Sequence, residues 1–256
     1  MNLQFDFGLT KGYRSKSQMA RVLTEDWMHR NMYCPRCGFI RIERFKNNQP
    51  VADFFCPECS NEYELKSKKG TLGAKINDGA YDTMIKRTTG NYNPDFFFMT
   101  YSFVKQRVND LIFIPKHFFV PEMIEKRKPL SQNARRAGWV GCNILIDKVP
   151  EQGMVSIISD GEINNKNTVL SKVNQGSNLE VKNINSRGWL MSVLNCVNRI
   201  PASVFTLKDV YQFEAELRLN YPQNRNIQAK IRQQLQFLRD KGVLEFLGRG
   251  EYKKIV

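Results

Sequence analysis

Hydrophobic residues in the first half of the chain alternate between the spacing of a helix and the spacing of strands. The segment 15–32 has one apolar face at helical spacing, formed by Met19, Val22, Leu23 and Trp27. Apolar or alternating residues predict β-strands at 51–55, 61–66, 95–101 and 110–114, and 77–87 predicts a second helix. This order predicts an α/β domain with a mixed sheet flanked by helices.

The pattern changes at 174–185, where polar residues predict a linker. Helical segments follow at 186–198, 206–220 and 226–241, and short strands at 243–247 and 252–255 flank a Gly-Arg-Gly turn. Thr206 and Asp209 have the spacing of a capping box at the start of the second helix. Three helices and a small hairpin predict a winged helix, so we expect one domain over 1–180 and another over 181–256.

The chain is strongly basic. Its 256 residues include 39 Lys and Arg against 25 Asp and Glu, which gives a formal net charge of +14. A field of this sign favours a polyanionic partner such as nucleic acid. No apolar run approaches the ~18 residues of a membrane span, and the amino terminus lacks the pattern of a secretory signal. We therefore expect a soluble, cytoplasmic, nucleic-acid-binding protein without membrane contact, and nothing indicates a protein partner.

Four of the six cysteines form two Cys-x-x-Cys pairs, Cys34 with Cys37 and Cys56 with Cys59. Eighteen residues separate the pairs, which is the spacing of a four-thiolate zinc site. Two disulfides or two redox dithiols are the alternatives, and both are disfavoured by a reducing compartment and by the lack of a thioredoxin-like pattern. Because four thiolates leave zinc no open position, we expect this metal to organise the fold.

An acidic constellation overlaps the second cysteine pair. Asp53 lies on one predicted strand, and Glu64 and Lys66 share a face of the next, because side chains alternate along a strand. If these strands pair, Asp53, Glu64 and the backbone carbonyl of Leu65 can hold Mg²⁺. Lys66 would then orient the attacking water near a scissile phosphate. This is the PD-(D/E)xK arrangement of nucleases, although Pro50 stands three residues before Asp53. Solvated strand charges are the alternative.

The predicted winged helix carries its own basic surface. From residue 185 onward there are 12 Lys and Arg against 6 Asp and Glu. The third helix of such a domain enters the major groove, and the wing touches the backbone. The candidate DNA contacts are Asn226, Lys230, Arg232 and Gln233 on that helix and Arg249 in the wing. A winged helix that binds protein is the alternative.

Several segments together resemble a known family. They are L-T-E-D-W, C-P-x-C, N-N-x-P-V-A-D-F and E-L-K-S-K-K-G in the first third, A-R-R-A-G-W at 134–139, and S-R-G-W, I-R-Q-Q-L-Q and G-R-G near the end. This set is similar to the DpnI-type methyl-directed restriction endonucleases, and the resemblance runs almost end to end.

The resemblance implies a Mg²⁺-dependent enzyme that cuts duplex DNA at GATC when its adenine carries an N6-methyl group. It implies a zinc-containing PD-(D/E)xK domain followed by a winged helix, and both domains can read the methylated site. By motif match, the resemblance implies that Asp53, Glu64 and Lys66 are the catalytic residues. It implies that the zinc ligands are Cys34, Cys37, Cys56 and Cys59. The match also makes Trp139 the aromatic residue that inspects the methyl group, with Arg135 and Arg136 as neighbouring DNA contacts.

Methyl reading by one tryptophan is weak on physical grounds. Burying a methyl group against an aromatic ring contributes roughly 1 kcal/mol, which corresponds to about fivefold to tenfold discrimination. Tests by two domains on both strands of a palindrome would multiply this factor. An ordinary core tryptophan is the alternative interpretation of Trp139.

The sequence is also compatible with two other functions. One is a non-catalytic zinc and winged-helix DNA-binding regulator, which would have no reason to keep Lys66 on the same strand face as Glu64. The other is a PD-(D/E)xK enzyme for branched DNA or RNA, which the duplex-reading winged helix disfavours. For the leading hypothesis, we expect the Cys56–Cys59 pair to set the turn between the two catalytic strands.

Overall fold

The structure is a computed structural model that describes residues 1–45, 52–90 and 93–255. Pro50 and Val51, which precede Asp53 in the acidic constellation, lie outside these residues. Within the described residues, seven strands form the main sheet in the order β1-β2-β3-β5-β6-β9-β10. Their bounds are Glu43–Arg44 (β1), Phe54–Phe55 (β2), Glu62–Lys69 (β3), Asp95–Ser102 (β5), Arg107–Ile114 (β6), Val155–Ser159 (β9) and Glu162–Ile163 (β10). β3 and β5 pair in parallel, while the other neighbours are antiparallel.

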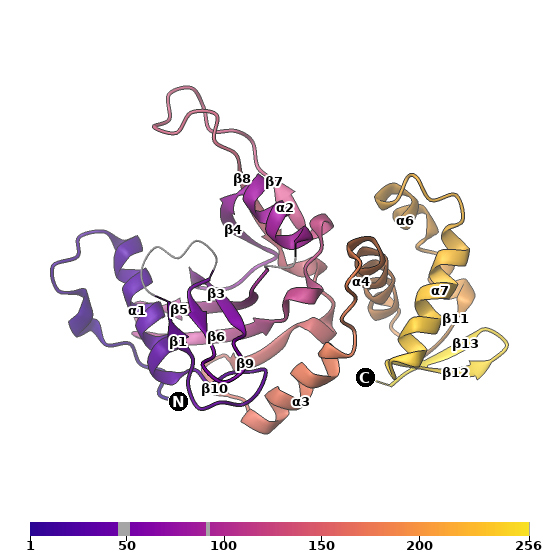
Figure 1. Ribbon diagram of the computed structural model, residues 1–256, viewed down its shortest axis with the longest axis horizontal. Coiled ribbons are helices and arrows are strands. Elements are labelled where there is room, and N and C mark those ends of the chain that lie inside the picture. The colour runs from indigo at the N-terminus through magenta and orange to yellow at the C-terminus, as the bar shows by residue number, and fades with distance from the viewer. Residues whose placement is uncertain (46–51, 91–92, 256) are drawn as a thin grey trace.

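Side chains alternate between the two faces of this sheet, and each face has its own hydrophobic core. On one face, Phe97 of β5 packs in a core with Trp27 of helix α1 (Lys16–Asn31) and Val173 of helix α3 (Lys166–Ser177). On the other face, Phe96 belongs to a core that includes Met84 of helix α2 (Tyr81–Thr89). The sheet is therefore covered on both faces, and the predicted α/β architecture is confirmed (Figure 1).

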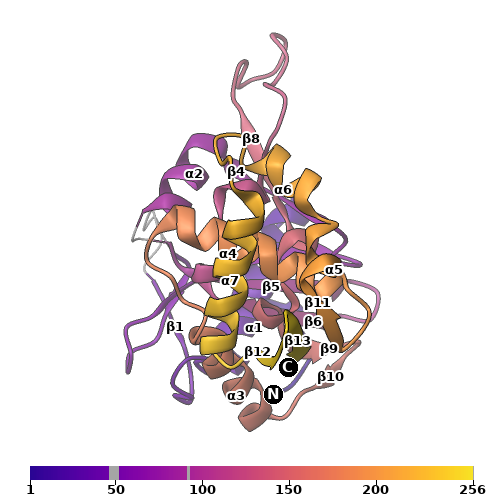
Figure 2. The same ribbon diagram turned by 90° about the vertical axis from the view of Figure 1, so that its right-hand side faces the viewer.

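A second, small sheet stands beside α2. It has the order β4-β8-β7, with bounds Lys75–Ala80 (β4), Ile124–Lys126 (β7) and Gly141–Leu145 (β8). The predicted helix over 77–87 is therefore wrong in its first turn, because 75–80 is a strand. Ile76 is buried in this strand, which pairs with β8 and has a bulge between Asp78 and Ala80. The loop 127–140 between β7 and β8 projects from the body in both views (Figures 1 and 2).

The segment before the carboxyl-terminal domain differs from the prediction. Helix α3 includes 174–177 and helix α4 begins at Ile184, so only 178–183 of the predicted linker 174–185 lies between helices. Asn165 caps α3 by accepting hydrogen bonds from Asn167 and Thr168. Val169 and Val173, four residues apart, are buried against the sheet. A capped helix with one apolar face therefore forms despite its polar composition.

The predicted winged helix is confirmed. Its helices are α4 (Ile184–Arg199), α5 (Leu207–Tyr211), α6 (Glu214–Asn220) and α7 (Ile227–Asp240), and its strands are β11 (Val204–Thr206), β12 (Leu244–Gly248) and β13 (Glu251–Lys254). The capping box of Thr206 and Asp209 opens α5 as predicted. The predicted middle helix is divided, since Gln212 and Phe213 separate α5 from α6.

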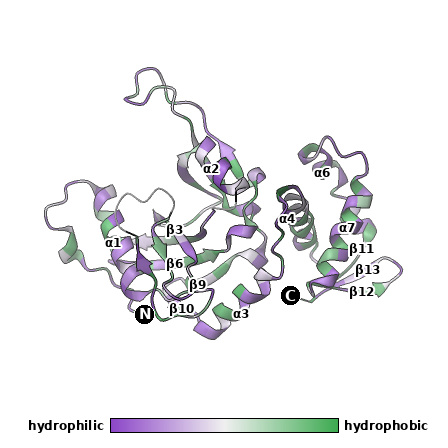
Figure 3. Ribbon diagram, in the orientation of Figure 1, coloured by the Kyte–Doolittle hydropathy of each residue, from purple (hydrophilic) through white to green (hydrophobic). Residues whose placement is uncertain are grey.

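Helix α4 lies between the main sheet and the rest of the winged helix (Figure 1). Hydrophobic residues run along it, in contrast to the mainly polar loop 127–140 (Figure 3). It contacts α7 on one side and a short 3₁₀ helix, Lys116–Phe118, on the other. The side chains of Asn198 and Gln152 exchange two hydrogen bonds of 2.9 and 3.1 Å. The winged helix is thus packed directly against the sheet domain.

Further 3₁₀ helices span Phe7–Thr10, Pro121–Met123, Ile146–Lys148 and Glu151–Gly153. Throughout the part of the chain that the structure describes, no helix combines the length and apolar character needed to cross a bilayer.

Candidate functional site

Asp53 is held at the edge of β3 by two hydrogen bonds. Its backbone N–H donates to the carbonyl of Tyr63 at 2.9 Å, and the N–H of Leu65 donates to its Oδ2 at 2.8 Å. The N–H and C=O of a strand residue point to the same edge, so the carbonyl of Leu65 also lies on the edge that faces Asp53. The predicted pairing of the two strands is confirmed, with Phe54 opposite Tyr63.

Glu64 and Lys66 lie next to each other on one face of β3. Glu64 Oε1 is 2.5 Å from Lys66 Nζ, and Glu64 Oε2 accepts a hydrogen bond of 2.5 Å from Arg87 of α2. Lys66 also forms an ion pair with Asp78 of β4. These four side chains are at most 18% exposed. Sequence reasoning identified neither Asp78 nor Arg87.

Burial and the charges around this strand shift the pKa values of Asp53 and Lys66. Burial raises the pKa of Asp53, and the nearby carboxylates of Glu64 and Glu25 add to the effect, against the hydrogen bond from Leu65. Burial alone would lower the pKa of Lys66, but the carboxylates of Glu64 and Asp78 outweigh it and hold this pKa above its ordinary value. Asp53 is therefore a carboxylate that a nearby cation would stabilise.

A cavity of about 380 Å³ opens beside these groups. Its lining comes from α1, including Arg21 and Glu25, from Asp53, and from the 64–67 segment of β3. Glu25 is paired with Arg21 at 2.6 Å. Among the residues that the structure describes, only the cysteines form a group of three or more ligands for a metal. A cation at Asp53 and Glu64 would thus complete its coordination with backbone oxygen, water or substrate.

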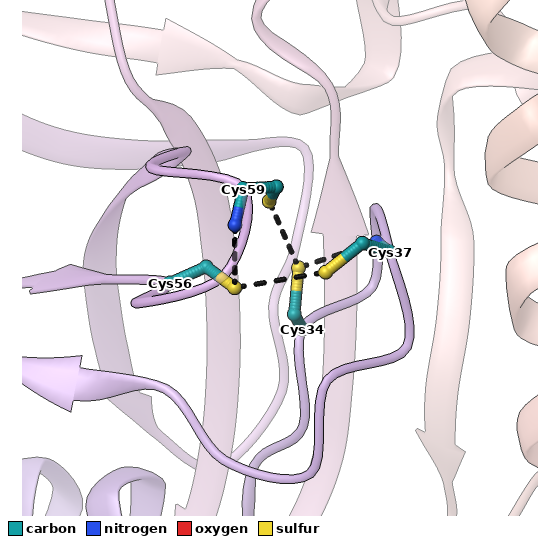
Figure 4. Close-up of side chains that lie close together, drawn as sticks. All are labelled: Cys34, Cys37, Cys56 and Cys59. Atoms are coloured by element: carbon teal, nitrogen blue, oxygen red, sulfur yellow. Dashed lines mark hydrogen bonds between the residues drawn. The ribbon is translucent and has the colours of Figure 1, made fainter.

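The four paired cysteines converge on one point (Figure 4). Their sulfur atoms all lie within 4.8 Å of one another, with 3.6 Å separating Cys34 from Cys59 and Cys37 from Cys56. A tetrahedral site with zinc–sulfur bonds of about 2.3 Å has sulfur–sulfur edges of about 3.8 Å. The N–H of Cys37 and of Cys59 each point at the sulfur three residues earlier. All four are free thiols, so the donor set fits structural zinc.

Two contacts fasten this cysteine cluster to the main sheet. Arg36, between the first pair, forms a bidentate ion pair of 2.7 and 2.8 Å with Asp95 at the start of β5. Asp95 is fully buried and also accepts from Asn61 at 2.7 Å. Tyr63 of β3 places its hydroxyl 2.9 Å from the sulfur of Cys34. The cluster is therefore coupled to the same strand that carries Glu64 and Lys66.

Trp139 lies at the base of the projecting loop 127–140. Its ring packs on Gly141, where an added Cβ would come within 2.8 Å of the ring. The guanidinium of Arg136 lies over the ring at 4.8 Å from its centre. Trp139 is half-buried by these neighbours, whereas Trp27 is a fully buried core residue. Arg135 and Arg136 are exposed on the loop.

The predicted DNA contacts of the winged helix lie at the start of α7, along α7 and in the wing between β12 and β13. Ile227, Ile231, Leu235 and Leu238 are buried as predicted. Asn226, Arg232, Gln233 and Arg249 are exposed, and Lys230 is half-buried beside the Trp189 ring. Arg232 donates to the Tyr211 hydroxyl at 2.8 Å, and Arg249 adopts a positive φ of 49° in the wing.

Two family models match the chain. The DpnI model, described as the Dam-replacing family, matches residues 1–182. The Dam-replacing HTH (helix-turn-helix) domain model matches residues 185–254, which run from the second residue of α4 to the end of β13. The first match covers the sheet domain with the cavity and the cysteine cluster, and the second covers the winged helix.

Proposed function

Because the chain belongs to the DpnI, Dam-replacing family, we propose that it is a type II restriction endonuclease that cuts duplex DNA at GATC sites carrying N6-methyladenine. The observation that carries this proposal is that Asp53, Glu64 and Lys66 line one cavity beside β3. In a family of restriction enzymes, such a set favours hydrolysis of a phosphodiester over binding alone. We propose 1–180 as the nuclease domain and 181–256 as the DNA-binding domain.

Asp53, Glu64 and the carbonyl of Leu65 are the proposed ligands of Mg²⁺, which would supply a Lewis acid at the scissile phosphate. All three offer hard oxygen atoms, which is what this ion prefers. The raised pKa of Asp53 supports the assignment, because a cation would stabilise its charged form.

Lys66 is the proposed group that orients the attacking water. An ammonium has three N–H donors, and within the part of the chain that the structure describes its two ion-pair partners are the carboxylates of Glu64 and Asp78. One donor therefore remains for a water molecule or a phosphate oxygen. The positive charge of Lys66 would also stabilise the negative charge that develops on the phosphate.

The thiolates of Cys34, Cys37, Cys56 and Cys59 are the proposed ligands of one structural Zn²⁺, which would join the two cysteine turns. Because four protein ligands leave no open position, this metal is given no part in hydrolysis. Its proposed contribution is to fix the turn between β2 and β3, and through it the position of Asp53 beside Leu65.

We assign DNA reading to two surfaces. One is the loop 127–140 with Trp139, Arg135 and Arg136, where the aromatic ring would contact the methyl group and the arginines the phosphates. The other is α7 with Asn226, Lys230, Arg232 and Gln233, together with Arg249 in the wing. The exposed position of the loop and the net basic charge support both assignments.

The decisive experiment compares one plasmid in two methylation states. With Mg²⁺ present, the plasmid methylated at its GATC adenines should be cut and the unmethylated plasmid should survive, and EDTA should stop the reaction. Equal cutting of both plasmids would contradict methyl reading. Binding of both without cutting would favour the DNA-binding regulator instead.

A further inference from the structure

Asp78 occupies a position that the proposed mechanism does not use. It comes from the small sheet, yet its carboxylate lies against the ammonium of Lys66 on the main sheet. Its side chain is only 7% exposed. The same Oδ1 also accepts a hydrogen bond of 2.7 Å from the N–H of Gly79, which fixes the carboxylate on the β4 bulge.

The charges around Lys66 suggest a role for its ion pair with Asp78. Glu64, Asp78, Lys66 and Arg87 form a group of two negative and two positive side chains, which is neutral without Asp53. A cation bound to Glu64 would compete with Lys66 for the Glu64 carboxylate. Asp78 would then be the carboxylate that keeps the ammonium of Lys66 in place.

The strand that carries Asp78 also supports the loop with Trp139. Asp78 is paired with Cys142 of β8, and Ala80 is paired with Gly141. Gly141 in turn contacts the ring of Trp139. The path from the ring to Lys66 therefore passes through one backbone pairing and one ion pair.

We infer that Asp78 is a positioning residue of this nuclease: it holds Lys66 and couples it, through β4 and β8, to the loop that bears Trp139. The inference rests on the function proposed above. It assigns Asp78 no contact with substrate or with metal. A structural ion pair alone would stabilise the fold without any link between methyl reading and cleavage.

The first test measures the amine of Lys66 directly and needs no cleavage. The full chain is treated with an amine-acylating reagent, and labelling is followed by mass spectrometry, with the exposed Lys68 and Lys69 on the same strand as internal standards. Lys66 should be labelled more slowly than both. Asp78→Asn should accelerate labelling of Lys66 several-fold and leave the standards unchanged. Equal labelling of Lys66 in the two proteins would overturn the ion-pair role.

The second test measures cleavage of methylated DNA in a single turnover with Mg²⁺. Asp78→Asn should slow cleavage at least about tenfold, because small displacements of a catalytic group cost rate steeply. Binding of the same DNA in EDTA should stay within about twofold, and Asp78→Glu should recover part of the rate, which loss of folding would not allow. The matched control is Asp82→Asn in the exposed first turn of α2, which should cut like the parent. A parental rate for Asp78→Asn would refute the proposal.

Coupling is tested by combining Asp78→Asn with Trp139→Ala. The loss of methyl discrimination caused by Trp139→Ala should be smaller when Asp78 is already changed, and additive effects would exclude the link. If the parent chain cut no DNA, the proposed function would be wrong. If Asp78→Asn still accelerated labelling of Lys66 in that case, the ion-pair role of Asp78 would stand on its own.

Discussion

At the scale of single residues, Asp53 is the side chain whose charge should matter most. Asp53→Asn keeps a group that can accept the hydrogen bond from Leu65 but removes the negative charge from the cavity. We expect cleavage in Mg²⁺ to fall by about a hundredfold or more, while DNA binding is retained. Cleavage assays on methylated plasmid and binding in EDTA measure the two effects. If the variant cut at the parental rate, Asp53 would have no place in the site.

Trp139 and Arg136 should affect different quantities although they stack on each other. Trp139→Ala removes the aromatic face and should lower the ratio of cleavage rates on methylated and unmethylated DNA about fivefold. Arg136→Ala removes the proposed phosphate contact and should weaken binding of both DNAs alike. Rates and affinities on the two DNAs separate these outcomes. If Trp139→Ala left the ratio of the two cleavage rates unchanged, Trp139 would serve only in packing.

Some residues of the site could be identified from sequence, and others could not. Glu64 and Lys66 are two apart on a strand, so alternation alone places them on one face. Asp78 and Arg87 reach the same point from another sheet and another helix. Their positions depend on how β4 and α2 pack against β3, and no local spacing encodes that packing. The sequence therefore predicts that Glu64 and Lys66 lie together, but not which charges surround them.

At the scale of elements, patterns with a strong local signal were predicted well. The strands β3 and β5, helix α7 and the capping box of α5 all follow from periodicity or from one capping pattern. The helix predicted over 77–87 overlaps β4 at 77–80, where Asn77, Asp78 and Gly79 follow no strand pattern. β4 is a strand because β8 pairs with it. Tertiary pairing overrode local preference at that point.

The unit made of β2, the Cys56–Cys59 turn and β3 should depend on its metal. We expect one zinc per chain, and Cys59→Ser should weaken zinc retention and slow cleavage even though Cys59 does not line the cavity. Tyr63→Phe is the milder variant, because it keeps the ring packed against Phe97 and removes only the hydroxyl beside Cys34. Its zinc affinity should fall about tenfold. Competition with a chromophoric chelator measures the zinc affinity of both variants. A parent protein that is fully folded without metal would contradict the proposed zinc site.

At the scale of the whole molecule, the two domains are held together by a buried layer. This layer includes α4, the Lys116–Phe118 turn and the end of α3. His117 lies within it and is 1% exposed, with its Nε2 donating to the carbonyl of Gly176 at 2.8 Å. Its Nδ1 has no hydrogen-bond partner among the residues that the structure describes. Burial, followed by the nearby positive charge of Arg36, lowers the pKa of His117 to about 4, against weaker opposing effects of Gly176, Asp95 and Glu180.

This depressed pKa predicts how the stability of the molecule depends on pH. Because the folded-state pKa lies below the ordinary value of 6.5, the contribution of His117 is complete above pH 6.5 and is lost as the pH falls toward 4. The full loss amounts to about 3 kcal/mol in the free energy of unfolding. His117→Gln keeps an N–H donor for Gly176 and does not titrate. The free energy of unfolding of this variant should therefore fall less steeply between pH 6.5 and pH 4. Denaturant unfolding of both proteins from pH 7 to pH 4 measures the difference. Because both proteins keep the four clustered cysteines, any release of the proposed zinc in acid would affect them alike. Parallel stability curves would rule out His117 as the source of the pH dependence.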